Sequence, residues 1–217
     1  MSERVSSLPE RWSARWEQAR EWMALGVIFI PVGERLLARY SEPGRHYHDG
    51  RHVLACLDAF DNFPGNVRDN DALELAIWFH DAIYDAHASG GKNEADSANL
   101  YLHEVGLLAR GLFDDEKVRR LILATRHADE PDGADEAVIQ DIDLGTLGAA
   151  PGRYDLYAGE IRQEYAHVDD DAYRDGRAAV LRGFLGRKRI YHTRHFRKLL
   201  EKQARENMLR ELASLGE

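Results

Sequence analysis

Residues 75–85 read Leu-Ala-Ile-Trp-Phe-His-Asp-Ala-Ile-Tyr-Asp, an apolar run in which the pair His80-Asp81 is embedded. An ionised carboxylate beside apolar neighbours is costly unless a counter-charge or a metal ion compensates it. His52 precedes this run and Asp143 follows it, and each also lies among apolar residues. These four side chains offer two imidazoles and two carboxylates, a ligand set that suits divalent Mn, Mg, Fe, Co, Ni or Zn. We therefore expect a metal site.

Helical periodicity dominates the chain, and convincing alternating strand patterns are absent. Turn signals such as Pro43-Gly44 and Pro131-Asp132-Gly133 separate the expected helices. The sequence predicts an all-α bundle of about ten helices, and the expected ranges are 8–25, 33–41, 49–62, 69–86, 93–109, 114–128, 134–147, 151–168, 170–186 and 195–215. With 217 residues and no break in composition, we expect a single domain, in which helices from 150–216 pack on a motif-bearing core at 45–145.

Composition narrows the classes of partner. The net charge of −9 argues against a nucleic-acid polymer, but it is compatible with a small phosphorylated metabolite, because a metal and a few arginines can dominate one pocket. The single cysteine, Cys56, lies among apolar residues and is interpreted as a small buried residue. The N-terminus lacks an apolar stretch of signal-peptide length, and the run 27–32 is too short to cross a bilayer. We expect a cytoplasmic protein with no membrane partner.

Three carboxylates close to the predicted ligands need separate assignments. Asp141 and Asp143 point in different directions on a helix, and the apolar neighbours of Asp143 favour it as the one that reaches the site. Asp85 shares a helix face with Asp81 at a spacing of four, so it either handles a proton of a water molecule or faces solvent at the helix end. Glu94 follows a glycine-rich loop and opens a helix, where the helix dipole favours a carboxylate. It could instead hold a metal-bound water or a histidine at the site, and both roles could apply.

Four further residues are candidate phosphate contacts. His127 ends a helical run, where a further metal ligand, a phosphate contact and a dipole-stabilised helix end are alternatives. Arg45, Arg162 and Arg177 carry guanidinium groups, which match phosphate bidentately. For each arginine, a surface ion pair is the simpler explanation.

The order His52, His80-Asp81, Asp143 resembles the His…His-Asp…Asp pattern of the HD superfamily of metal-dependent phosphohydrolases. Tyr47-His48-x-x-x-His52 is similar to the Tyr-His-Asn-x-x-His motif of cyclic nucleotide phosphodiesterases, and residues 121–125 are similar to their Ile-Leu-Ala-Thr segment. This resemblance implies that His52 is a metal ligand. It also implies that His48 is the general acid that protonates the leaving oxygen.

Over residues 35–215 the chain is most similar to small bacterial proteins predicted to be HD-type phosphohydrolases. The motifs that carry this similarity are Arg45-His46-Tyr47-His48, residues 78–85, Asn93-Glu94-x-x-Ser97-Ala98, Thr125-x-His127, residues 141–144, Arg162-x-Glu164-Tyr165 and Ala204-Arg205-x-Asn207. Residues 80–85 also resemble the His-Asp-x-x-Glu-Asp stretch of alarmone hydrolases, but Tyr84 replaces the glutamate, which puts that particular activity in doubt.

The resemblance implies a metal-dependent phosphohydrolase that cleaves a phosphoester of a nucleotide or a related metabolite with a metal-activated water. Two alternatives remain open. An HD-fold mixed-valent di-iron oxygenase would need additional histidines between the His-Asp pair and Asp143, and His87, His103 and His127 lie in that interval. A non-catalytic nucleotide-binding protein would keep the fold, although the intact ligand pattern and the retained His48 argue against it.

Overall fold

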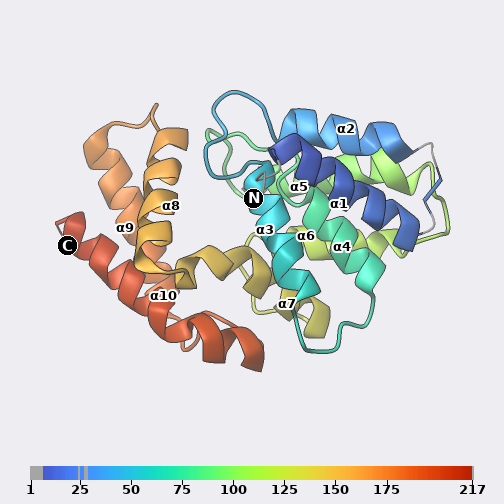
Figure 1. Ribbon diagram of the computed structural model, residues 1–217. Coiled ribbons are helices and arrows are strands. Elements are labelled where there is room, and N and C mark those ends of the chain that lie inside the picture. The colour runs from blue at the N-terminus through green and yellow to red at the C-terminus, as the bar shows by residue number, and fades with distance from the viewer. Residues whose placement is uncertain (1–6, 24, 27–28, 217) are drawn as a thin grey trace, which may run out of the picture.

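The computed structural model describes residues 7–23, 25–26 and 29–216, and all regular elements within them are helical, as predicted (Figure 1). Ten α-helices are described: α1 (Leu8–Trp22), α2 (Ile30–Arg39), α3 (Gly50–Asp61), α4 (Asn70–Phe79), α5 (Lys92–Tyr101), α6 (Asp115–Ala124), α7 (Ala134–Asp143), α8 (Pro151–Glu164), α9 (Asp170–Gly186) and α10 (Arg194–Ser214). A π-helical turn, η2 (Leu102–Gly106), extends α5, and a 3-10 turn, η3 (Leu144–Gly148), extends α7.

The observed helices match the predicted ranges closely, with one difference that concerns the site. The predicted helix 69–86 ends at Phe79, so His80 and Asp81 lie at its C-terminal end rather than in its middle. Aspartates cap the N-terminal ends of α3 and α4. Asp49 accepts a hydrogen bond from the backbone N–H of Arg51 at the start of α3, and Asp69 accepts one from the backbone N–H of Ala72 at the start of α4. These side chains satisfy backbone donors that the first helical turn leaves unpaired.

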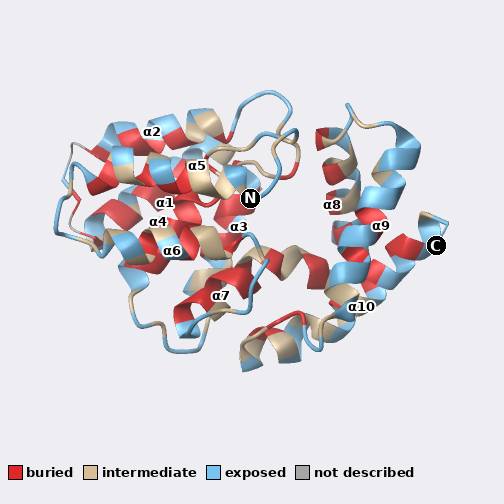
Figure 2. Ribbon diagram, turned by 180° about the vertical axis from the view of Figure 1, so that it is seen from behind, coloured by how far each residue is buried: buried red, intermediate tan, exposed pale blue. Residues whose placement is uncertain are grey.

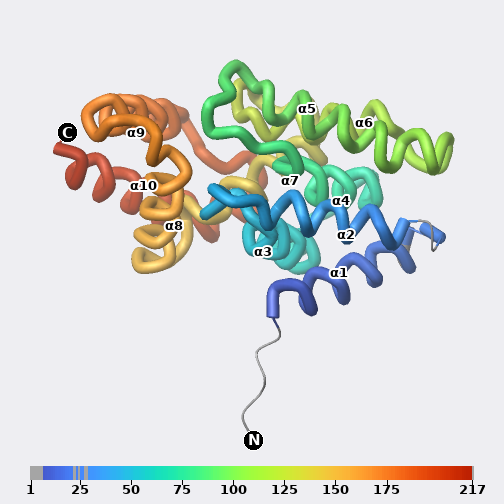
Figure 3. The backbone as a smooth tube through the Cα atoms, turned by 90° about the horizontal axis from the view of Figure 1, so that it is seen from above, coloured from blue at the N-terminus to red at the C-terminus, as the bar shows by residue number. Residues whose placement is uncertain are grey.

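Helices α1 to α7 form one group, and α8, α9 and α10 form a second group beside it (Figures 1 and 3). The turn η3 leads from the first group to the second and packs closely on α10. Glycine is required at Gly148, because an added Cβ would lie 2.5 Å from Cβ of Leu200. The carboxylate of Asp141 on α7 accepts hydrogen bonds from the backbone N–H groups of His192 and Thr193, each at 2.7 Å. This carboxylate therefore holds the start of α10 against α7.

The core of the first group centres on Trp78 of α4, and Figure 2 shows the buried faces of its helices turned toward one another. Trp12 and Trp16 of α1 pack edge-on against Trp78, with ring centroids 4.8 and 5.0 Å away. Edge-to-face pairs of this kind add to the stabilisation that burial of the rings provides. A Cβ at Gly33 would lie 2.3 Å from the Trp16 ring, so α2 can approach α1 only with glycine there. This packing fixes α4 and the His-Asp pair at its end.

Across the described ranges, no helix combines the length and the apolar character needed to cross a membrane.

Candidate metal centre

The structure brings the four predicted ligands together. His52 comes from α3, His80 and Asp81 from the end of α4, and Asp143 from the end of α7. The Nε2 atoms of His52 and His80 are 3.1 Å apart, and Oδ1 of Asp143 is 3.0 Å from the first and 3.5 Å from the second. Oδ2 of Asp81 lies 3.1 Å from Nε2 of His80 and 3.6 Å from Nε2 of His52.

These separations match the spacing of ligands around one metal ion. Two donor atoms that each lie about 2.1 Å from a metal, at octahedral or tetrahedral angles, are about 3.0 to 3.4 Å apart. The ring of His80 is also oriented for this role, because its Nδ1–H donates to the carbonyl of Ile77 at 2.9 Å and leaves Nε2 free to bind. Oδ2 of Asp81 is buried without a hydrogen-bond donor among the described residues. A metal ion could be held among these donor atoms.

The thiol of Cys56 belongs to the same buried cluster but faces it differently. His52, Cys56, His80 and Asp143 place one ligand-type atom each within 4.8 Å of one another, so this cluster could hold a metal ion. The sulfur, however, lies 3.8 and 3.7 Å from the two ring nitrogens of His52, nearly equidistant from them. It is therefore beside the ring rather than along the Nε2 lone pair. Burial raises the pKa of this thiol well above its usual range and favours the neutral form. Asp81 completes the set better than Cys56.

The carboxylates and imidazoles shift one another's pKa values. Burial alone would lower the pKa of His80, but the charge of Asp81 and the hydrogen bond to Asp143 outweigh it and hold this pKa well above its usual range. Burial alone would raise the pKa of Asp81 and of Asp143, but the imidazoles around them outweigh it and lower both. The cluster of His52, His80, Asp81 and Asp143 thus favours positive charge. Because a metal binds the neutral imidazole, binding would release the proton of His80.

Arg45 binds the backbone that directly follows α4. Its buried guanidinium donates to the carbonyls of Asp81 at 2.7 Å and Ala82 at 3.0 Å, just beyond the helix, and to the carbonyl of His48 at 3.0 Å. The hydroxyl of Tyr40 donates to the carbonyl of Trp78 at 3.1 Å. Carbonyls at a helix end need such partners. Arg45 therefore holds the His-Asp pair and His48 together, and it does not line the pocket, contrary to its candidacy as a phosphate contact.

His127 holds the second oxygen of Asp143. Its Nε2–H donates to Oδ2 of Asp143 at 2.7 Å, while Oδ1 of the same carboxylate faces His52 and His80. His127 has a φ of 54°, in the left-handed region that few residues other than glycine adopt. The Arg187 side chain donates to its carbonyl at 2.5 Å and stabilises this conformation. The strained backbone thus serves to aim an imidazole at a predicted metal ligand.

Glu164 at the end of α8 organises the other wall of the site, and its side chain is 0% exposed. One oxygen accepts the backbone N–H groups of His46, Tyr47 and His48 at 2.9, 2.8 and 2.9 Å. The other accepts Nδ1–H of His48 at 2.7 Å and the hydroxyl of Tyr84 at 2.9 Å. The His48 ring also stacks on Tyr84, with centroids 4.2 Å apart. His48 therefore has one fixed orientation, with Nε2 left to act as a donor.

Asp81 and Glu164 together raise the pKa of His48. Burial alone would raise the pKa of Glu164, but the hydrogen bonds from His48 and from the backbone outweigh it and lower the pKa to about 2. Burial alone would lower the pKa of His48, whereas the negative charge of Asp81 and the hydrogen bond to Glu164 outweigh it and raise this pKa. A histidine in this setting keeps its proton at higher pH than a free one.

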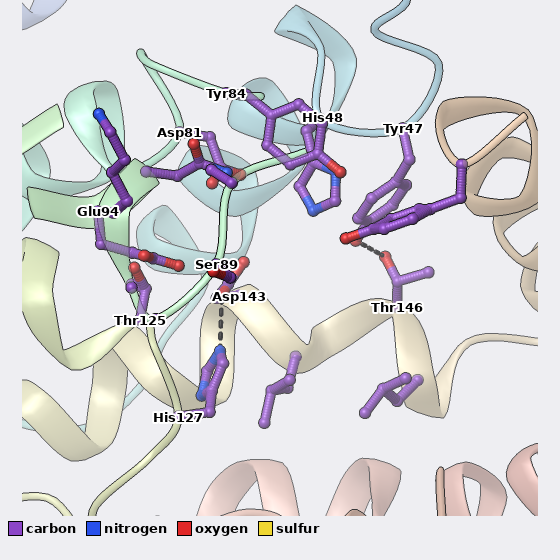
Figure 4. Close-up of a pocket in the computed structure, with 18 of the residues that line it drawn as sticks. Tyr47, His48, Asp81, Tyr84, Ser89, Glu94, Thr125, His127, Asp143 and Thr146 are labelled. Atoms are coloured by element: carbon purple, nitrogen blue, oxygen red, sulfur yellow. Dashed lines mark hydrogen bonds and ion pairs between the residues drawn. The ribbon is translucent and has the colours of Figure 1, made fainter. Parts of the chain in front are cut away.

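A pocket of about 320 Å³ opens above these groups (Figure 4). This volume is in the range of small-molecule sites. Asp81 and Asp143 line it, and Glu94 extends toward its interior, as Figure 4 shows. The other walls come from both helix groups and from the glycine-rich loop: Tyr47, His48, Tyr84, Ser89, Gly90, Gly91, Thr125, His127, Thr146, Tyr157, Tyr165 and Phe184.

Like Arg45, the predicted residues Asp85, Arg162 and Arg177 do not reach this pocket. Asp85 is 61% exposed and bonds to His87, because α4 ends before it and the spacing of four from Asp81 no longer places both on one helix face. Arg162 closes the loop after α8 by donating to the carbonyls of Tyr165 and Val168. Arg177 forms a buried ion pair with Glu211 of α10 at 2.8 Å.

A second iron would require histidines from the interval between the His-Asp pair and Asp143. Of the three histidines in that interval, only His127 lies at the site. His87 is 69% exposed and His103 is 77% exposed. Both lie outside the pocket lining. The arrangement therefore offers one extra histidine beside the four-residue cluster.

Sequence reasoning assigned no role to Glu164, although periodicity could have drawn attention to it. Tyr157, Ile161 and Glu164 follow at spacings of four and three, and all three are buried on one face of α8. A carboxylate on such a face needs partners. Its partners lie near residue 46, more than a hundred positions away, and no local pattern specifies them.

Comparison of the chain with protein-family models, with curated proteins and with solved structures finds no match.

Proposed function

We propose that this protein is a metal-dependent phosphohydrolase of the HD type, with His52, His80, Asp81 and Asp143 as ligands of a divalent ion. The proposal rests on the sequence resemblance and on one structural observation. The two carboxylates of the cluster, Asp81 and Asp143, line the same pocket as a histidine, His48, whose Nδ1 is bound to a buried carboxylate. Ligand-type residues on one side and an oriented proton donor on the other are what hydrolysis of a phosphoester requires.

The chain's own residues would divide the work as follows. His52, His80, Asp81 and Asp143 would hold the cation, which would supply Lewis acidity toward a water molecule and a phosphoryl oxygen. His48 donates the proton of Nε2 to the leaving oxygen, and Glu164 stabilises the charged ring before the transfer. Glu94 lines the pocket and is placed to accept the proton that the attacking water loses.

The protons and bonds balance in this scheme. A bond from the water oxygen to phosphorus forms while the bond from phosphorus to the leaving oxygen breaks. One proton moves from water to Glu94 and one moves from His48 to the leaving oxygen. Proton exchange with solvent then restores both side chains, so the sum is phosphoester plus water giving phosphate plus alcohol. We propose a nucleotide or a related phosphorylated metabolite as the substrate.

The test is hydrolysis of 4-nitrophenyl phosphate and bis(4-nitrophenyl) phosphate by protein loaded with Mn, Mg, Co or Fe. We expect turnover that depends on the metal and is lost in His80→Ala. His103→Ala is the matched control, because His103 is exposed and outside the pocket, and we expect it to keep full activity. A metal-replete and active His80→Ala protein would refute the proposal. Two irons per chain without hydrolysis would favour the oxygenase instead.

A further inference from the structure

A second cavity of about 470 Å³ adjoins the pocket above the metal ligands. It lies between α8 and α9, which run side by side in the second helix group (Figure 1). His48, Tyr157 and Tyr165 line both cavities. The two spaces therefore adjoin along these three residues. We call the second cavity the tyrosine chamber, after the residues Tyr157, Tyr165 and Tyr173 in its wall.

The walls of the tyrosine chamber are aromatic and aliphatic. Ile161, Val168 and Val180 complete the apolar surface beside the three tyrosines. Such walls, with few polar groups, are typical of sites that take a flat, uncharged ring. Stacking of a base on an aromatic side chain strengthens binding by about tenfold or more.

The charge that borders the chamber is already balanced. The guanidinium of Arg177 lines the chamber but donates to both oxygens of Glu211, at 2.8 and 3.0 Å, and to the hydroxyl of Tyr157 at 3.3 Å. Because this arginine is buried in its ion pair, it does not demand an anion from the chamber. A phosphate is therefore expected on the metal side of His48, and a neutral group on the chamber side.

From this arrangement we infer that the tyrosine chamber binds the aromatic ring of the leaving group of the substrate. The inference rests on the proposed function, in which His48 protonates the leaving oxygen. An in-line displacement places the attacking water and the leaving oxygen on opposite sides of phosphorus. The leaving oxygen must therefore lie beside His48, and whatever it carries extends past His48 into the chamber. A purine nucleoside is a leaving group of this chemical class.

Gly176 offers a way to fill the chamber without disturbing the fold. It lies on α9 in the chamber wall, and a Cβ added there meets no atom within 4 Å. Replacing a helical glycine also removes a cost in helix propensity, so Gly176→Phe is expected to fold. Gly183→Phe is the matched control, because Gly183 lies on the same helix, has equally open surroundings and does not line the chamber.

The first measurement compares adenosine 5′-monophosphate with ribose 5-phosphate, which share the leaving oxygen and differ by the purine ring. We expect the wild type to prefer the nucleotide in kcat/KM by about tenfold or more, as base stacking allows. Gly176→Phe should abolish this preference through KM, and Gly183→Phe should retain it. A wild type without the preference, or a preference that survives Gly176→Phe, would overturn the inference.

The second measurement separates this inference from the proposed function. Binding of adenosine, the product alcohol, is followed by calorimetry in wild type, Gly176→Phe and Gly183→Phe. We expect Kd to rise about tenfold or more in Gly176→Phe alone. If adenosine binds in this way but neither phosphate is hydrolysed, the proposed function fails and the chamber stands as a ring-binding site. If adenosine does not bind the wild type, the chamber assignment is wrong, whatever the hydrolysis shows.

Discussion

The carboxylate of Glu164 lies 2.7 Å from Nδ1 of His48, a residue 116 positions earlier in the chain. Its other oxygen binds three successive backbone N–H groups that lead into α3. One buried side chain thus fixes the backbone, the ring orientation and the charge of His48. The site therefore depends on α8 as well as on the helices that carry the predicted ligands.

Replacing Glu164 with glutamine should lower the pKa of His48, because one of the negative charges that favour the protonated ring is lost while that of Asp81 remains. The alkaline limb of the pH–activity profile should move to lower pH, and kcat should fall. Glu160→Gln is the control, since Glu160 is on the same helix and pairs with Arg51 and Arg153. An alkaline limb that stays in place in Glu164→Gln would show that Glu164 does not act through His48.

The same residue predicts how stability depends on pH. The pKa of Glu164 is about 2 in the folded protein against an ordinary 4.5, so its stabilising contribution is present above pH 4.5 and is lost as the pH falls toward 2. Urea unfolding should show wild type more stable than Glu164→Gln by about 1.5–3 kcal/mol at pH 7, the contribution of a charged hydrogen bond. The gap should shrink at pH 3. A gap of equal size at both pH values would contradict this assignment.

Removing Arg45 should destabilise the protein and loosen the site. Arg45→Ala leaves three carbonyls without their donor, which we expect to cost about 2–4 kcal/mol. Arg45→Lys should lose less, since the ammonium keeps the charge but cannot reproduce the planar set of donors. Thermal unfolding measures both, with Arg110→Ala at an exposed position as control. Equal stability of Arg45→Ala and Arg110→Ala would mean that these hydrogen bonds do not hold the end of α4.

His127 combines two effects that two substitutions can separate. His127→Ala and His127→Gly both remove the hydrogen bond to Asp143, so both should weaken metal binding by about 10- to 100-fold. Only glycine relieves the left-handed backbone, so His127→Gly should be more stable than His127→Ala by about 1 kcal/mol. Metal titration and urea unfolding give the two quantities. Wild-type metal affinity in both variants would exclude His127 from the support of Asp143.

The sequence predicts the helices and the cluster well, because both follow from local signals. Apolar periodicity and the turn signals between the helices give most helix positions. Ligand-type residues inside apolar runs identify His52, the His-Asp pair and Asp143 as a group that the fold brings together. Asp141 and Asp143 were distinguished by their neighbours alone, and the structure places Asp141 on backbone donors and Asp143 at the cluster.

What the sequence could not predict depends on distant partners. No glycine or proline marks the end of α4 at Phe79. Arg45 and Tyr40 donate hydrogen bonds to backbone carbonyls around this helix end, and both residues are distant in the sequence. The expected face shared by Asp81 and Asp85 disappears with that helix end. The prediction that Arg177 contacts a phosphate failed for the same reason. Its partner Glu211 lies on another helix, and the ion pair holds Arg177 outside the pocket that the metal ligands line.

The most direct test of the metal centre is equilibrium binding of Mn²⁺ to protein freed of metal by chelation. Asp81→Asn and Asp85→Asn form a matched pair, because the two aspartates are four residues apart and only Asp81 faces the imidazoles. We expect saturable binding by the wild type and by Asp85→Asn, and a loss of affinity of about 100-fold or more in Asp81→Asn. No binding by the wild type, or equal binding by both variants, would contradict the assignment of the four ligands.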